Sequence, residues 1–190
     1  MARTCSYAIR CLLSAVLVAT LTSCGSSSLN STSVFVGDSI TQFWPLPKHN
    51  AGISSQTTVQ MLARFNADVL GHGYKRVVIL GGTNDVRFSQ TSVLDVSTNL
   101  DAMAAIARVA GIEVVLCKIP PIISLDRGDL TAQVNSVNDA IAALAEERGY
   151  LLVDYYTPMA GHPEYFLDGL HPNSIGYAVM ETALWEVVVR

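Results

Sequence analysis

The sequence predicts an α/β domain of three layers, in which helices cover both faces of a parallel β-sheet. Short, continuous apolar runs rich in β-branched residues alternate with longer segments whose apolar positions recur every three or four residues. Continuous apolar runs are typical of parallel strands, which are buried on both faces. The 190 residues allow one domain with a sizeable core. The pattern therefore predicts a sheet of four or five strands.

Four strands are expected where an apolar run meets glycine or a polar residue. These runs are Val34–Val36, Val77–Leu80, Val114–Leu116 and Leu151–Val153. The segment His49–Ile53 is either a short additional strand or a loop at a strand end. Pro45 and Pro47 exclude a long helix just before this segment, because proline removes a backbone donor and clashes with the preceding turn.

Four helices are expected between and after these strands. They span Thr57–Leu70, Ser92–Ala110, Thr131–Arg148 and Ser174–Val188. The core-facing positions that the periodicity selects are Val59, Leu62 and Val69 in the first, Val93, Val96, Leu100, Met103, Ala107 and Ala110 in the second, and Val134, Val137, Ile141 and Leu144 in the third. Thr57 or Thr58 is expected to cap the first helix, and Pro172-Asn173 to begin the last.

The N-terminus has the pattern of a secretory signal peptide over residues 1–23. Arg3 and Arg10 form a basic region ahead of the apolar stretch Cys11–Leu21. This stretch is too short to span a bilayer comfortably, and small residues follow it. Residues 1–23 are therefore set apart from the folded domain.

The junction Leu21-Thr22-Ser23-Cys24 resembles the lipobox of bacterial lipoproteins. This resemblance implies that Cys24 carries acyl chains and anchors the protein in a membrane of the cell envelope, the outer membrane if the host is Gram-negative, since Gly25 follows the cysteine. Ordinary secretion, or a periplasmic location, with an incidental cysteine is the alternative. Residues 24–32, rich in Ser and Gly, then form a flexible tether, and residues 33–190 form the domain.

The charge of the chain argues against nucleic acid as a partner. The formal net charge is −4, and it becomes −6 when the signal peptide removes two arginines and no acidic residue. No basic cluster interrupts this mildly acidic body. Cys5 and Cys11 belong to the predicted signal peptide, and Cys24 is the candidate lipidation site, so no disulfide framework is available. The remaining cysteine, Cys117, lies inside an apolar run and is expected to be a small core residue. The oligomeric state stays open.

Polar clusters follow three strand ends, and in open parallel sheets ligands bind at that edge. Ser39 comes directly after the first strand and is a candidate nucleophile. A serine hydroxyl needs an adjacent base, and His171 is the natural one. Asp168, three residues earlier, is expected to accept the other ring N–H of His171, although it could merely cap a turn.

Acyl transfer also needs hydrogen-bond donors aimed at the developing oxyanion. The candidates are the side-chain amide of Asn84 and the backbone N–H groups of Gly52 and Ser39. Two neighbouring carboxylates have plainer roles: Asp38 is expected to make a local turn or cap bond, and Asp85 to hold its own loop. His49, His72 and His162 are expected to be surface or loop histidines.

Taken together, these motifs resemble the four blocks of the SGNH (GDSL-type) hydrolase family. They are Gly37-Asp38-Ser39, Gly52 after Asn50, Gly82-Thr83-Asn84-Asp85, and Asp168-Gly169-Leu170-His171-Pro172, and they occur in the family's order over residues 37–172. The resemblance implies a flavodoxin-like sheet of five parallel strands. Where many relatives have a second glycine after Gly52, this chain has Ser54 and Ser55.

The resemblance also implies an activity and a set of roles. Ser39 is the nucleophile, Asp168 and His171 complete a triad, and Ser39, Gly52 and Asn84 form the oxyanion hole. The expected function is a serine esterase without cofactor or metal, acting on short-chain, lysophospholipid-like or acetylated carboxylic esters. A carbohydrate O-acetylesterase or a thioesterase is the alternative within the family.

Two functions from other classes remain as alternatives. Asp38, Asp85, Asp168 and His171 suggest a metal-dependent phosphoesterase, although such a site needs more ligands on convergent loops. A non-catalytic lipoprotein on a flavodoxin-like scaffold is the other, although the loop after the first strand lacks a phosphate cradle. An intact serine–histidine pair would also be unexplained in that protein.

Overall fold

The computed structural model describes residues 31–89, 91–124 and 126–189. The predicted signal peptide and the candidate lipidation site Cys24 lie outside this part of the chain. Among the described residues, no helix combines the length and the apolar character that crossing a membrane requires.

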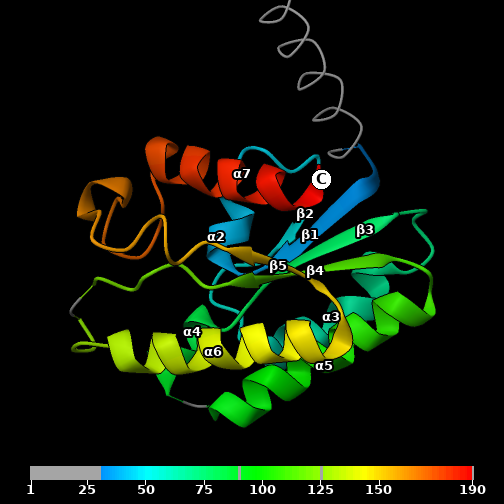
Figure 1. Cartoon of the computed structure of the whole chain (residues 1–190), viewed down its shortest axis with the longest axis horizontal. Coiled ribbons are helices and arrows are strands. Elements are labelled where there is room, and N and C mark those ends of the chain that lie inside the picture. The colour runs from blue at the N-terminus through cyan, green and yellow to red at the C-terminus, as the bar shows by residue number, and fades with distance from the viewer. Residues whose placement is uncertain (1–30, 90, 125, 190) are drawn as a thin grey trace, which may run out of the picture.

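A sheet of five parallel strands forms the middle layer, which confirms the predicted fold class (Figure 1). The strands are β1 (Ser33–Gly37), β2 (His49–Gly52), β3 (Arg76–Leu80), β4 (Glu113–Lys118) and β5 (Leu151–Asp154). They lie side by side in the order β2-β1-β3-β4-β5. The ambiguous segment near residue 50 is thus a strand, β2, which pairs with β1 at one edge of the sheet.

Helices cover both faces of the sheet. The long ones are α3 (Thr58–Val69), α5 (Val93–Val109), α6 (Thr131–Arg148) and α7 (Ser174–Val188). Figure 1 shows α3, α5 and α6 on one face, and α7 together with the short α2 (Ser39–Gln42) on the other. The observed ends of the four long helices differ from the predicted ones by one residue at most. Thr57 is the N-cap of α3 and Asn173 that of α7.

Three short elements escaped sequence-based prediction. They are α2, α4 (Thr83–Phe88) and the 3-10 helix η1 (Pro163–Tyr165). Each is too short to show a helical period, so only local backbone geometry defines it. The helix α4 matters most, because it follows β3 and carries Asn84 at its beginning.

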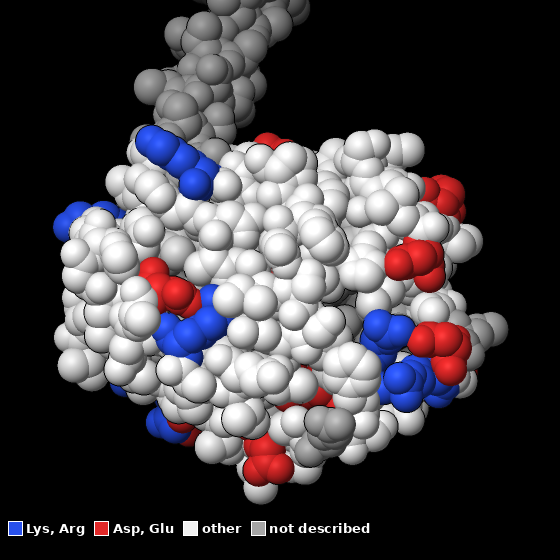
Figure 2. All heavy atoms as spheres, turned by 180° about the vertical axis from the view of Figure 1, so that it is seen from behind, with Lys and Arg blue, Asp and Glu red and all other residues white. Residues whose placement is uncertain are grey.

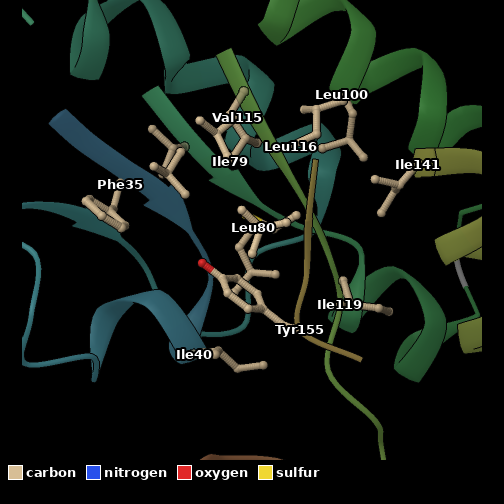
Figure 3. Close-up of a cluster of buried hydrophobic side chains, with 14 of the residues drawn as sticks. Phe35, Ile40, Ile79, Leu80, Leu100, Val115, Leu116, Ile119, Ile141 and Tyr155 are labelled. Carbon is tan, nitrogen blue, oxygen red and sulfur yellow. The ribbon is translucent and has the colours of Figure 1, made fainter. Parts of the chain in front are cut away.

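The core lies on both sides of β1, β3 and β4, where Phe35, Ile79 and Leu116 are almost fully buried (Figure 3). The four positions predicted for α6 are all buried, as are Val96, Leu100, Met103 and Ala107 of α5. The predicted core roles of Val59, Val93 and Ala110 are wrong, because these residues lie at helix ends where the surface is open to solvent. In α3 the core face is formed by Met61, Phe65 and Val69 instead, with Leu62 half-buried.

Cys117 is a buried, free thiol in β4, so its predicted place in the core is confirmed. Burial raises the pKa of this thiol to about 12, which keeps it protonated and unreactive at neutral pH. It belongs to the packing of the sheet.

The strand order places a switch point beside β1. The chain leaves β1 in one direction, to β2, and then crosses back over β1 to β3. Connections that diverge in this way leave a crevice outside the carboxyl ends of β1 and β3. Ser39 follows β1 and Asn84 follows β3 at this edge.

Charged side chains on the face shown in Figure 2 are mixed in sign, with uncharged residues between them. Several basic side chains of the described chain are paired, including Arg87 with Asp126, Lys118 with Asp154 and Arg148 with Asp101. Figure 2 shows no extended patch of one sign among the described residues of this face.

Candidate functional site

Ser39 is held by the tight turn from β1 into α2. A Cβ at Gly37 would lie 2.0 Å from Thr41 Oγ1 and 2.7 Å from Leu80 O, so the turn requires glycine. Asp38 is the N-cap of α2, and its Oδ1 accepts a hydrogen bond from Ile40 N at 2.9 Å. The expected local cap bond of Asp38 is thus confirmed. Ser39 begins the helix and is 8% exposed.

The loop carrying Asp168 and His171 is a compact turn built on backbone hydrogen bonds. Asp168 Oδ1 accepts from the N–H groups of Leu170 (3.0 Å) and His171 (2.8 Å). Gly169, at φ +81°, presents its carbonyl to the N–H groups of Ile123 and Ser124. The segment after β4 therefore clamps this loop in place.

The structure brings Ser39, His171 and Asp168 into one hydrogen-bonded line. His171 Nε2 lies 3.0 Å from Ser39 Oγ, and His171 Nδ1 lies 2.7 Å from Asp168 Oδ2. Because an ionised carboxylate only accepts hydrogen bonds, the neutral imidazole carries its proton on Nδ1 and turns the Nε2 lone pair toward the serine hydroxyl. Asp168 thus both closes its turn and orients the ring.

Asp168 remains ionised well below neutral pH. Partial burial opposes ionisation, but the backbone N–H of His171, the His171 ring and the N–H of Leu170 together lower the pKa of this carboxyl to about 2. Its contribution to stability is thus present above the ordinary value of 3.8 and is lost as the pH falls through about 2.

The amide of Asn84 lies beside the turn of Ser39. Its Nδ2 donates to Gln56 O at 3.0 Å and to Asp38 Oδ2 at 3.3 Å. The following residue, Asp85, was expected to hold its own loop. It instead accepts from the backbone N–H (3.0 Å) and the hydroxyl (2.7 Å) of Thr58, and so ties α4 to the beginning of α3.

Gly52 ends β2 at the same edge of the sheet, opposite Gly37 in the register. Its backbone N–H donates to Asn50 Oδ1 at 2.9 Å. The Asn50 amide in turn donates to Thr41 O (2.7 Å) and Trp44 O (3.3 Å), which ties β2 to α2. The sequence analysis assigned no role to Asn50. Its position two residues before Gly52 is the signal that could have identified it.

Gly52→Ala is expected to displace α2, because the added Cβ would lie 2.2 Å from Gln42 N and 2.7 Å from Gln42 Cα. Overpacking against backbone costs about 1–3 kcal/mol of stability, and a 1 Å shift of Ser39 costs on the order of 10²-fold in turnover of any reaction that uses it. Chemical denaturation and ester hydrolysis measure the two effects. Gly71→Ala is the control: it lies at φ +82° with open space around it, so it should lose stability only. Normal turnover in Gly52→Ala would contradict the expected displacement.

Asp38 is fully buried behind Ser39, and burial raises the pKa of its carboxyl to about 6, against the opposing hydrogen bond from Ile40 and the charge of His171. The sequence indicated only the cap bond. The second oxygen, which faces Asn84, adds a role in orienting that amide.

Asp38→Asn is expected to change how stability depends on pH. The folded-state pKa of about 6 lies above the ordinary 3.8, so the stabilising contribution of Asp38 is complete below 3.8 and is lost as the pH rises through 6. A pKa difference of this size corresponds to about 3 kcal/mol in the free energy of unfolding. Denaturant unfolding from pH 4 to 8 should show the variant gaining stability relative to the parent as the pH rises. A difference that is constant over this range would refute the prediction.

Ser55 adopts the left-handed conformation, at φ +64°, in the loop where the chain has serines in place of a second glycine. Non-glycine residues pay about 1 kcal/mol or more in this region. Ser55→Gly is therefore expected to raise the free energy of unfolding by about 0.5–1 kcal/mol. Ser89→Gly, at φ +50°, is the matched second case, and unfolding in urea measures both. A loss of stability in both variants would show that the strain is absent.

The carboxylates that suggested a metal centre face different partners. Asp85 binds Thr58, Asp38 binds Ile40 and Asn84, and Asp168 binds His171. Within residues 31–89, 91–124 and 126–189, no group of three or more His, Cys, Asp or Glu side chains is arranged to hold a metal ion. The donor set of the site fits a serine–histidine pair better than a metal.

The sequence profile of the GDSL-like Lipase/Acylhydrolase family matches residues 23–179 of this chain. No curated protein sequence matches this chain. Among solved structures, a GDSL-like lipase from Bacteroides thetaiotaomicron is 32% identical, with a TM-score of 0.76 over 81% of this chain and 85% of that one. A structure from Bacteroides fragilis is 31% identical, with a TM-score of 0.75 over 81% and 84% of the two chains.

A more distant likeness is to a catalytic mutant of an acetylxylan esterase from Geobacillus stearothermophilus. The two chains are 18% identical, with a TM-score of 0.70 over 81% of this chain and 92% of that one. Identity at this level shows a shared fold.

Proposed function

The chain belongs to the GDSL-like lipase/acylhydrolase family, and on this basis we propose that it is a serine esterase whose nucleophile is Ser39. The observation that carries the proposal is the hydrogen-bonded line from Ser39 through His171 to Asp168 at the carboxyl edge of the sheet. A serine becomes a nucleophile when a base takes its proton and a third group orients that base.

The reaction proceeds through an acyl-enzyme. His171 Nε2 takes the proton of Ser39 as Oγ attacks the ester carbonyl, and returns it to the alcohol oxygen as that bond breaks. Asp168 holds the ring and stabilises the imidazolium that forms in between. Water then enters, and the same histidine activates it to release the acid.

The oxyanion that forms during attack is stabilised by the N–H groups of Ser39 and Gly52 and by the amide of Asn84. In the structure, two of these donors bind neutral or carboxylate oxygens of the chain itself, Gly52 to Asn50 and Asn84 to Gln56 and Asp38. A full negative charge on the substrate oxygen makes stronger hydrogen bonds than the neutral carbonyl oxygen of the bound ester does. The donors therefore favour the transition state over the bound ester.

Reaction with a nitrophenyl phosphonate tests the nucleophile directly, since such reagents phosphonylate activated serines. We expect one adduct per chain, on the peptide that contains Ser39, and none in Ser39→Ala. Ester hydrolysis in the presence of a chelator is the companion measurement. Loss of activity with chelator, or a label on another residue, would favour the metal-dependent phosphoesterase or a different nucleophile.

For the substrate we propose a carboxylic ester with a short acyl group, with an acetylated carbohydrate or a thioester as the alternatives. The support is the small size of the folded domain and the shared fold with an acetylxylan esterase. Rates on nitrophenyl esters from acetyl to palmitoyl, beside an acetylated sugar and a lysophospholipid, distinguish these classes.

We also propose that Cys24 is lipidated and anchors the enzyme in a membrane of the cell envelope. The support is the sequence Leu21-Thr22-Ser23-Cys24 after an apolar stretch. Expression of the full chain in bacteria fed labelled palmitate should label the protein, and Cys24→Ser should remove the label and free the protein from the membrane fraction. A labelled Cys24→Ser variant would rule out this anchor.

A further inference from the structure

A cavity of about 420 Å³ lies beside His171, on the side of α2 and α7. Its walls come from the chain after α2, with Phe43 and Pro45, from the loop before α7, with Leu167 and Pro172, and from α7 itself, with Tyr177. These side chains are mostly apolar. Phe43 is 57% exposed and Leu167 is 75% exposed, although both are large and hydrophobic. Two exposed apolar side chains at the rim of one cavity indicate a ligand that covers them.

The cavity adjoins the proposed base. Both His171 and Asp168 contribute to its lining, and the ring of Phe43 meets the ring of His171 edge to face, with centroids 5.8 Å apart. A group bound in this cavity therefore lies against the proposed base, whose Nε2 is 3.0 Å from the hydroxyl of Ser39 just outside the lining.

The chemistry of the proposed reaction decides which part of an ester lies there. The carbonyl oxygen faces the donors of Gly52 and Asn84, while the ester oxygen that leaves must face His171, which protonates it. From this placement, and resting on the proposed esterase function, we propose that the cavity binds the alcohol portion of the substrate and selects esters of neutral, apolar alcohols.

The lining also argues against an anionic alcohol. No Lys or Arg belongs to the described residues that line the cavity. The only ionised carboxylate there, Asp168, already accepts hydrogen bonds from His171 and Leu170. An alcohol that carries a phosphate, as in a lysophospholipid, would lose its hydration without gaining a cation.

The acylation of Ser39 is reversible, and the alcohol occupies the cavity in both directions. In acylation the Ser39 Oγ–carbon bond forms, the carbon–alkoxy bond breaks, and the proton from Ser39 passes through His171 to the departing alcohol. In the reverse step an alcohol in the cavity gives its proton to His171 and attacks the acyl carbon; the bond from that carbon to Ser39 Oγ breaks, Oγ takes the proton from His171, and an ester is regenerated. The cavity should therefore also favour apolar alcohols over water as acyl acceptors.

Two series of esters test the proposal with the full-length enzyme. In the first, acetate is kept and the alcohol is ethanol, hexanol or benzyl alcohol; in the second, ethanol is kept and the acid is lengthened from acetate to hexanoate. We expect kcat/KM to rise about tenfold or more along the first series and little along the second. The reverse pattern would overturn the assignment of the cavity to the alcohol.

Leu167→Asp and Phe43→Ala alter opposite walls and should each lower the ratio of kcat/KM for benzyl acetate over ethyl acetate about tenfold. Leu94→Asp is the matched control, because Leu94 is an equally exposed leucine on α5, and should leave the ratio unchanged. The share of acetyl-enzyme captured by added benzyl alcohol should fall in the same two variants. An unchanged ratio and unchanged capture in both would refute the proposal.

These outcomes separate the cavity from the esterase function itself. If hydrolysis of all the esters persists in Ser39→Ala, the proposed function fails. If hydrolysis depends on Ser39 but substitutions of Leu167 and Phe43 leave the preference among alcohols unchanged, only the assignment of the cavity fails.

Discussion

Ser39→Ala and His171→Ala are each expected to lower kcat/KM for nitrophenyl acetate by about 10⁴-fold or more, and the double variant should lose no more than the worse single one. The reason is the hydrogen bond of 3.0 Å between His171 Nε2 and Ser39 Oγ. Without the hydroxyl there is nothing for the base to activate, and without the base the hydroxyl stays protonated. Steady-state kinetics on the three variants measures this coupling.

The controls for this experiment are the same substitutions far from the site. Ser136→Ala removes an exposed hydroxyl of α6 that donates to Ala132 O, and His162→Ala removes an exposed ring near η1. Both should keep the parent rate. Unfolding curves should show that Ser39→Ala folds normally, since the only hydrogen bond of its hydroxyl in the described structure goes to His171. Additive losses in the double variant, or appreciable activity in Ser39→Ala, would contradict the proposed nucleophile and base.

Most of the fold could be predicted because four of its strands contain short, continuous apolar runs. Val77–Leu80 fits only a buried strand, and the switch from such runs to helical periods defines the α/β class. The strand β2 was ambiguous, since His49 and Asn50 are polar and its place at the sheet edge leaves no continuous apolar signal. Pairing with β1 decides its conformation, and pairing is not a local property of the sequence.

Errors in the predicted core arose at helix ends. Val59 and Val93 lie in the first turns of α3 and α5, where the helix surface is open to solvent, so a correct period still selects an exposed residue. In α3 the buried face is set by Met61 and Phe65, one residue away from the stripe that the sequence favoured. A period defines which residues share a face, but the packing partner defines how far the buried face extends.

The residues of the site could be selected from motifs, but their hydrogen bonds could not. Ser39 and His171 are 132 residues apart, and only the order of the strands brings them within 3.0 Å. The bond of Asn50 to Gly52 and the second bond of Asp38, to Asn84, depend on backbone geometry that a motif does not encode. The exposed side chains of Phe43 and Leu167, on opposite walls of the cavity, likewise have no sequence signature, since single exposed apolar residues are common.

Asn84→Ala is expected to lower kcat on the order of 10²–10³-fold, about 2.7–4 kcal/mol, with little change in KM. We expect the amide to bind the substrate oxygen only when it becomes an oxyanion, because in the structure Nδ2 donates to Gln56 O and Asp38 Oδ2 instead. An interaction that strengthens in the transition state acts on kcat, whereas one present in the bound ester would act on KM. Affinity for a boronic acid that mimics the tetrahedral intermediate should fall in parallel.

Asn84→Asp sharpens this test, because it keeps the shape of the side chain. Its carboxylate cannot donate to the oxyanion, repels it, and faces the carboxyl of Asp38, so we expect a loss of kcat at least as large as that of Asn84→Ala. Asn135→Ala, an exposed position on α6, is the control and should keep the parent rate. If Asn84→Asp retains kcat, or if Asn84→Ala raises KM while kcat stays constant, the amide binds the ground state only. The oxyanion would then depend on the backbone N–H groups of Ser39 and Gly52 alone.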